Sequence, residues 1–227
     1  MRHRSTILLT GFGPFPGVAD NVSARFVPKL ADLAARRFPG HRVVSRLLPT
    51  EWATAPERLA AWYAREKPRL ALHFGVSARA KGFVVETLAR NASCAREDAA
   101  GALPHAPCLV EDGPEALEVR LPARAIVTRL TALGLPAEVS GDAGDYLCNA
   151  VLYTSLLICA APGQTAAAGF IHIPTTLARR EKGTPSVEDG GALDWEGALA
   201  GGLEIIRTCL GRPAPARPPP RVRVKPR

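Results

Sequence analysis

Five cysteines supply the thiols of this 227-residue chain: Cys94, Cys108, Cys148, Cys159 and Cys209. Their number is odd and no two stand three positions apart, so the spacing fits neither a zinc site nor a disulfide framework. Cys148 differs from the others because it follows a short apolar segment and the turn SGDAGDY, and falls in the first turn of a predicted helix. Unpaired N–H groups and the helix dipole favour a thiolate there, so the sequence predicts a nucleophile. Cys159, about three turns further along the apolar face of this helix, is predicted to pack in the core.

A nucleophilic thiol needs a base, and two of the five histidines lie in apolar, strand-like segments. His73 stands in RLALHFGV, and His172 stands at the end of AAGFIHIP. The carboxyl ends of strands are where α/β proteins gather their sites, which favours His172, although most strand histidines are hydrogen-bonded core residues. Glu86, inside VVETLA, is expected to be paired because buried acids are rare otherwise. Its partner is expected to be the imidazole or an arginine such as Arg90 or Arg96.

The elements that must position these side chains follow an α/β pattern, in which short apolar runs alternate with longer helical stripes. We predict a single three-layer α/β/α domain over residues 1–211, built on a mixed, mostly parallel twisted sheet. The expected strands are residues 5–10, 42–48, 69–76, 83–93, 137–140 and 167–173. The expected helices are residues 23–37, 55–67, 122–133, 145–160 and 194–210, and residues 97–116 are expected to form a loop.

The composition is that of a soluble globular protein, with 47% hydrophobic and 22% charged residues and a mean hydropathy of +0.02. No run of about 18 apolar residues occurs, which argues against a transmembrane helix. The apolar stretch near the N-terminus is broken by the turn-forming residues of GFGPF and is too short for the core of a signal peptide. We therefore expect a cytoplasmic protein.

The net charge of +8 suggests a nucleic-acid partner until its distribution is considered. Residues 212–227, RPAPARPPPRVRVKPR, contain six of the basic residues and no acidic one. Without them the chain has 23 basic and 21 acidic residues, which is nearly neutral. We predict that 212–227 is a disordered Pro/Arg-rich tail, and that the protein has neither a nucleic-acid nor a membrane partner.

Several motifs, in order, resemble the pyroglutamyl peptidase I family, the C15 cysteine peptidases. They are TGFGPFPG, ETLARN, EDGP, SGDAGDYLCN and GFIHIP, and the resemblance runs from about residue 6 to residue 211. It implies a catalytic triad of Cys148, His172 and Glu86, with Arg96 supporting the oxyanion. It also implies an enzyme without metal or cofactor that assembles as a homodimer or homotetramer and hydrolyses the bond after an N-terminal pyroglutamyl (5-oxoprolyl) residue of a small peptide.

Four further residues are candidates for substrate binding. A pyroglutamyl group is a neutral lactam, so Phe12 and Phe15 would supply apolar walls, or would instead pack over the sheet edge. Asn21 would give a polar contact or hold the loop. Val76 stands in GVSARAKG, where a similar family segment has a glutamine that contacts the lactam. This difference leaves open a thiol hydrolase of altered specificity, and the basic tail leaves open a non-enzymatic binding protein.

Overall fold

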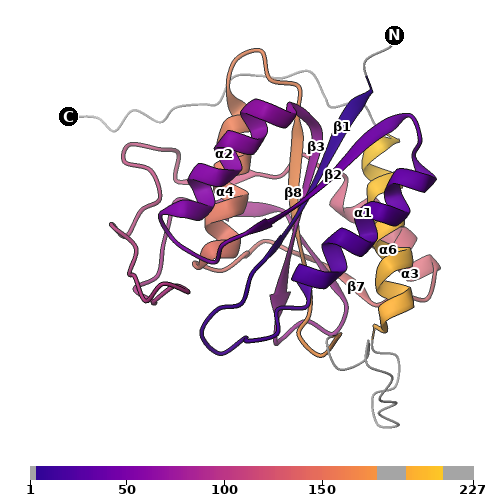
Figure 1. The fold of residues 1–227 in the computed structure, drawn as a ribbon, viewed down its shortest axis with the longest axis horizontal. Helices are drawn as coiled ribbons and strands as arrows, with labels where there is room; N and C mark the ends of the chain where they lie inside the picture. The colour runs from indigo at the N-terminus through magenta and orange to yellow at the C-terminus, as the bar shows by residue number, and fades with distance from the viewer. Residues whose placement is uncertain (1–3, 178–192, 212–227) are drawn as a thin grey trace.

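The computed structural model describes residues 4–177 and 193–211, and it folds as a central sheet with helices on both faces (Figure 1). The strands are β1 Ser5–Phe12, β2 His41–Leu48, β3 Pro68–Ser77, β4 Phe83–Glu86, β5 Leu88–Arg90, β6 Ala116–Glu118, β7 Ala137–Ser140 and β8 Ala167–Pro174. The helices are α1 Ser23–Arg37, α2 Thr54–Glu66, α3 Ala123–Ala132, α4 Leu147–Ala160 and α6 Trp195–Leu210. The predicted tail, 212–227, lies outside the described residues.

The main sheet has six strands in the order β2-β1-β3-β8-β4-β7. Strands β2, β1, β3 and β8 are parallel, β4 pairs antiparallel with β8, and β7 is parallel to β4. The sheet is therefore mixed and mostly parallel, which confirms the predicted fold class. Since the parallel strands end at one edge, the residues at the ends of β1, β3 and β8 are brought together there.

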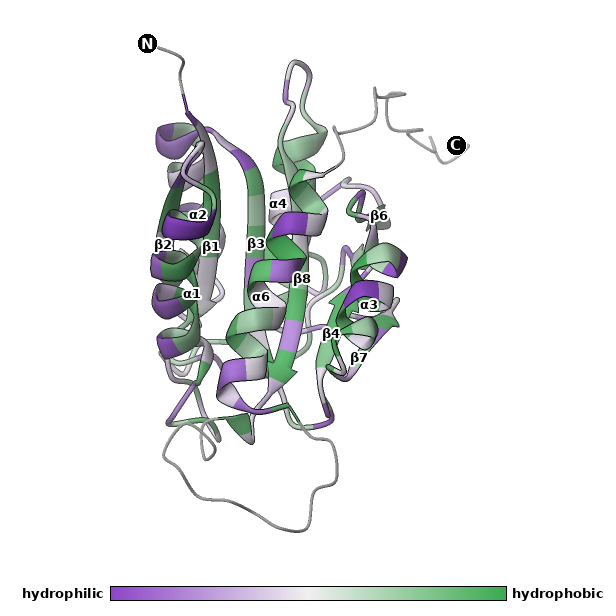
Figure 2. Cartoon of the chain, turned by 90° about the vertical axis from the view of Figure 1, so that its right-hand side faces the viewer, coloured by the Kyte–Doolittle hydropathy of each residue, from purple (hydrophilic) through white to green (hydrophobic). Residues whose placement is uncertain are grey.

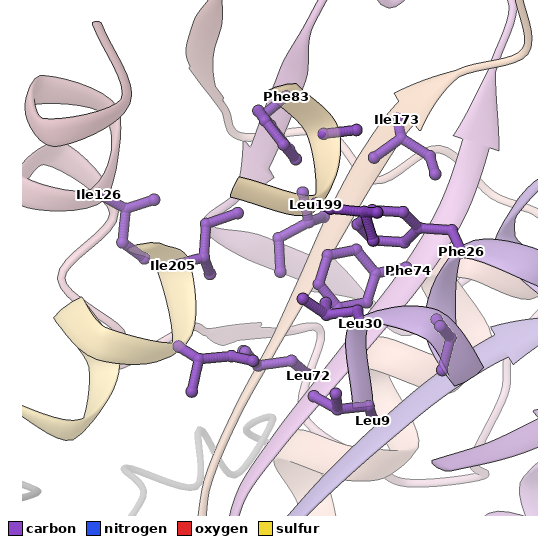
Figure 3. Close-up of a cluster of buried hydrophobic side chains, with 14 of the residues drawn as sticks. Leu9, Phe26, Leu30, Leu72, Phe74, Phe83, Ile126, Ile173, Leu199 and Ile205 are labelled. Carbon is purple, nitrogen blue, oxygen red and sulfur yellow. The ribbon is translucent and has the colours of Figure 1, made fainter. Parts of the chain in front are cut away.

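Two apolar clusters, one on each face, hold the layers together. On one face α1, α3 and α6 pack on the sheet: Phe26 and Leu30 lie against side chains of the central strands, and Ile126 of α3 lies beside Ile205 of α6 (Figure 3). On the other face α2 and α4 cover β1, β3 and β8 through a second cluster. Figure 2 shows β3 and β8 largely in hydrophobic colours between the helix layers. Strands buried on both faces are expected to be largely apolar, and these are, with His73 and His172 among the few polar side chains that they carry.

The predicted strand 83–93 is wrong as a single element. Its first part is β4 in the main sheet, and its second part is β5, which pairs antiparallel with β6 in a separate two-stranded sheet. Thr87 is the crossing point: its N–H donates to the carbonyl of Ser140, while its carbonyl accepts from the N–H of Val119. Both parts are apolar, so the sequence pattern does not reveal the change of sheet. Strand β6 was missed because it has only three residues.

None of the helices in residues 4–177 and 193–211 has the length and apolar content needed to cross a membrane.

Candidate active site

Cys148 lies in the first turn of α4, which begins at Leu147, as the sequence predicts. Gly144, with a φ of 78°, makes the turn that brings the chain from β7 into this helix. The half-buried thiol therefore lies beside the first N–H groups of the helix. No side chain caps α4 at Tyr146 and its first turn carries no acidic residue, so the positive end of the helix dipole acts on the thiol.

The glycine at the end of β3 makes room for this thiol. In the parallel pairing of β3 with β8, Gly75 stands opposite His172. A Cβ atom on Gly75 would lie 3.0 Å from the Sγ atom of Cys148 and 2.7 Å from the ring of Phe170. Only a residue without a side chain therefore allows the thiol, the phenyl ring and the strand end to meet. The sequence indicates no such role for this glycine, because β3 and α4 are far apart along the chain.

His172 and Glu86 form a buried pair on the same face of the sheet as Cys148. The Nδ1 atom of His172 lies 2.8 Å from Oε1 of Glu86, and the two residues are 9% and 1% exposed. Burial by itself would lower the pKa of His172. The charge and hydrogen bond of Cys148, together with those of Glu86, outweigh this effect and raise the pKa above its ordinary value. Between the alternatives left by the sequence, Glu86 pairs with the imidazole.

The other strand histidine, His73, is a core residue. It is fully buried, its Nδ1 lies 2.7 Å from Oγ1 of Thr10, and its Nε2 lies 2.6 Å from Oγ of Ser155. Burial lowers its pKa to about 3, so the ring is neutral. The sequence alone could not separate it from His172, since both lie in apolar strands.

The loop after β1 brings two of the predicted substrate residues towards this edge of the sheet. Phe12 is buried and packs against Phe170 with ring centroids 6.0 Å apart, whereas Phe15 is half-buried and lies 5.9 Å from the ring of Tyr146. Asn21 holds the loop, because its amide donates to the carbonyl of Gly13 and its Oδ1 accepts from Ser23. Of the two roles considered for Asn21, the structure shows the loop-holding one.

Val76 points away from the thiol. Its side chain packs against the apolar cluster under α1 and α6, whereas Gly75, the preceding residue, faces Cys148. Successive residues of a strand point to opposite faces, which accounts for the difference. The structure therefore does not bring Val76 together with the other predicted site residues.

Arg96 reaches the start of α4 through an aromatic residue that the sequence analysis did not single out. Its guanidinium lies 4.6 Å from the ring centroid of Tyr146, two residues before Cys148. Trp52 packs on the same ring at 5.2 Å, edge to face, and its indole N–H donates to the carbonyl of Arg96. An aromatic residue so close to the predicted nucleophile was the available signal for this cluster.

Within the described ranges, no group of three or more His, Cys, Asp or Glu side chains is placed to hold a metal ion. A cavity of about 390 Å³ lies between α2 and the loop after α4, at the opposite end of α4 from Cys148. It is lined by Ala60, Tyr63, Ala64, Lys67, Pro68, Ile158, Gly163, Gln164, Thr165 and Ala166.

Comparison with known proteins identifies close relatives. A family model for pyroglutamyl peptidase matches residues 5–193. A pyrrolidone-carboxylate peptidase of Chromobacterium violaceum is 39% identical over 170 residues, which cover 74% of this chain and 77% of the relative. The pyroglutamyl-peptidase 1 of Homo sapiens is 34% identical over 173 residues, covering 75% and 79%.

Solved structures show the same similarity. A mutant pyrrolidone carboxyl peptidase from Pyrococcus furiosus superposes with a TM-score of 0.78 at 30% identity, covering 91% of this chain and 98% of the other. The pyroglutamyl peptidase I of Bacillus amyloliquefaciens gives a TM-score of 0.76 at 25% identity, covering 92% and 98%.

Proposed function

The chain belongs to the pyroglutamyl peptidase family of cysteine peptidases, and from this premise we propose that it hydrolyses the bond after an N-terminal pyroglutamyl residue by means of Cys148, His172 and Glu86. The observation that carries the proposal is the buried hydrogen bond between His172 and Glu86 beside the thiol of Cys148. A thiol at a helix start, an imidazole and an orienting carboxylate are the parts of a nucleophilic triad.

In the first step Cys148 gives its thiol proton to His172, and the resulting thiolate attacks the carbonyl carbon of the pyroglutamyl residue, so that a C–S bond forms. The C–N bond to the next residue then breaks, and His172 donates its proton to the departing amine. The product of this step is a thioester between the enzyme and the pyroglutamyl group. Its formation needs an imidazolium, which the raised pKa of His172 makes available at neutral pH.

In the second step water attacks the thioester carbonyl. His172 accepts a proton from the water, the C–S bond breaks, and pyroglutamate leaves with the thiol restored. Glu86 holds Nδ1 of the imidazole throughout, so Nε2 is the nitrogen that exchanges protons with Cys148 and the substrate. The carboxylate also stabilises the positive charge that the ring carries between transfers.

The negative oxygen formed in both steps needs donors near the start of α4. The first N–H groups of the helix lie beside Cys148 and have no side-chain cap. Arg96, which stacks on Tyr146, brings a positive charge to the same helix end. We assign both to the support of this oxygen.

The pyroglutamyl ring would lie against the half-buried Phe15, because a neutral lactam fits an apolar wall and needs no charged partner, whereas the buried Phe12 packs in the core against Phe170. Asn21 contributes indirectly by fixing the loop that follows β1 and carries Phe15. Val76 lies on the other face of the sheet, so the altered specificity that this residue suggested has no support from its position. Specificity is better sought in the loop of Phe15.

The test is the release of a fluorophore from pyroglutamyl, prolyl and alanyl amides by the purified protein and by Cys148→Ser. We expect release from the pyroglutamyl amide alone and none from the variant. Equal release from all three amides would contradict the assigned specificity. Release that persists in Cys148→Ser would contradict the nucleophile.

A further inference from the structure

The residue after the thiol, Asn149, is fully buried and makes three hydrogen bonds with the backbone of another segment. Its Oδ1 accepts from the N–H of Arg90 at 2.9 Å, and its Nδ2 donates to the carbonyls of Arg90 at 2.8 Å and Ala92 at 3.0 Å. One side chain in the first turn of α4 therefore takes up three main-chain groups that lie almost sixty residues away in sequence.

The amide of Asn149 acts here as a neighbouring strand would. Strand β5 pairs with β6 along one edge, where Arg90 stands opposite Ala116. Alternate residues of an antiparallel strand direct their N–H and C=O groups away from the partner strand. At Arg90 these outward groups meet Asn149, which completes the edge of the small sheet and joins it to α4.

Residues 90–97, the segment that Asn149 joins to α4, include Arg96. Two more contacts tie this segment to the residues just before the thiol. The N–H of Cys94 donates to the carbonyl of Asp145, and the hydroxyl of Tyr146 donates to the carbonyl of Glu97, both at 2.9 Å. The Tyr146 contact is exposed to water, whereas Asn149 is fully buried. Loss of a buried amide leaves three backbone groups without partners, which costs more than loss of an exposed hydrogen bond.

We propose that Asn149 is a positioning residue for the reaction: it fixes segment 90–97 against the start of α4, and so holds Arg96 in register with the thiol of Cys148. The inference rests on the proposed function, since it assigns Arg96 to the oxygen of the reacting carbonyl. Asn149 itself contacts backbone groups and not the thiol. A displacement of about 1 Å in a group that stabilises charge lowers a rate by about 100-fold.

The experiment compares Asn149→Ala with the wild-type enzyme by two reactions of the same thiol. Hydrolysis of a pyroglutamyl amide needs the oxygen to be stabilised, whereas alkylation of Cys148 by iodoacetamide forms no such oxygen. We expect kcat to fall by about 10- to 100-fold. The rate of alkylation should stay within about twofold, because Cys148 and His172 keep their places.

Ser155→Ala is the matched control. Ser155 lies in the same helix and is equally buried, but its hydrogen-bond partners are His73 and Tyr63, which lie outside segment 90–97. It should lower the melting temperature and leave kcat within about twofold of wild type. If kcat in Asn149→Ala stays near wild type, or falls in proportion to alkylation, the positioning role is wrong.

Hydrogen exchange tests, independently of activity, whether Asn149 fixes segment 90–97 against α4. The backbone amides of residues 90–97 should exchange faster in Asn149→Ala than in the wild type or in Ser155→Ala. Unchanged exchange would overturn the proposal even if the variant were inactive. If the wild-type enzyme does not hydrolyse pyroglutamyl amides but residues 90–97 still exchange faster in Asn149→Ala, the proposed function is wrong. The attachment of segment 90–97 to α4 by Asn149 would then still stand.

Discussion

Gly75 and His172 stand opposite each other in the pairing of β3 with β8, and the thiol of Cys148 fits into the space that the glycine leaves. The thiol that we propose as the nucleophile comes from a helix and the imidazole that we propose as its base comes from a strand, so their meeting depends on how closely α4 approaches the sheet. Gly75 permits that approach, because a Cβ atom there would lie only 2.7 Å from the ring of Phe170 and 3.0 Å from the Sγ atom of Cys148.

Gly75→Ala should therefore damage catalysis more than stability. The new Cβ would meet the ring of Phe170 at 2.7 Å and the Sγ atom of Cys148 at 3.0 Å, so the ring and the sulfur must shift from their present positions. We expect kcat/KM to fall by about 10- to 100-fold, as for other small displacements of reacting groups. Gly40→Ala is the control, since a Cβ there meets nothing within 4 Å. Equal activity of the two variants would show that the thiol does not need this space.

Glu86→Gln should lower both the rate and the upper pH limit of activity. A glutamine keeps the size of the side chain but removes the charge that, against the effect of burial, helps to raise the pKa of His172. The imidazolium would then lose its proton at a lower pH, and the alkaline limb of the pH–rate profile should move towards neutrality. By analogy with triads whose carboxylate is replaced by an amide, kcat should fall by about 10²- to 10⁴-fold.

Glu57→Gln, on the exposed side of α2, is the control for that measurement and should match the wild type. An alkaline limb that stays in place in Glu86→Gln would mean that the carboxylate does not set the protonation of His172.

Arg96→Ala should reduce kcat while leaving KM nearly unchanged. The guanidinium stacks on Tyr146 at the start of α4, and it is assigned to the oxygen that becomes negative only during the reaction. Loss of one such donor commonly costs about 10²- to 10³-fold in kcat. The exposed Arg79, replaced by alanine, is the control for loss of one positive charge. A raised KM with normal kcat would place Arg96 in substrate binding instead.

The layered fold and the position of Cys148 at the start of a helix could be predicted from the sequence because both depend on local patterns. The apolar runs mark the strands, and the turn before Cys148 marks the start of α4. The assignment of the base could not be completed in the same way. His73 and His172 both lie in apolar strands, and only the packing shows that His73 is enclosed between Thr10 and Ser155.

Contacts between distant segments account for what the sequence did not predict. Thr87 divides an apolar run between two sheets through hydrogen bonds to Ser140 and Val119, which no local pattern reveals. The position of Val76 depends on which face of β3 meets α4, and that register is fixed by the whole sheet. Asn149 was overlooked because its partners lie in another segment of the chain.

The buried His73 should make the protein less stable in acid. Burial lowers the pKa of His73 to about 3 in the folded state, whereas an exposed histidine has a pKa of about 6.5. Between these values the unfolded chain binds one more proton, so stability is fully present above about pH 6.5 and decreases as the pH falls towards 3. One such group changes the free energy of unfolding by up to about 1.4 kcal/mol per pH unit.

Urea unfolding at pH 7, 6 and 5 should show a smaller pH dependence of the free energy of unfolding in His73→Gln than in the wild type, whatever the absolute stability of the variant. His105→Gln, at an exposed position, should keep the wild-type slope, and equal slopes in all three proteins would contradict the neutral state assigned to His73.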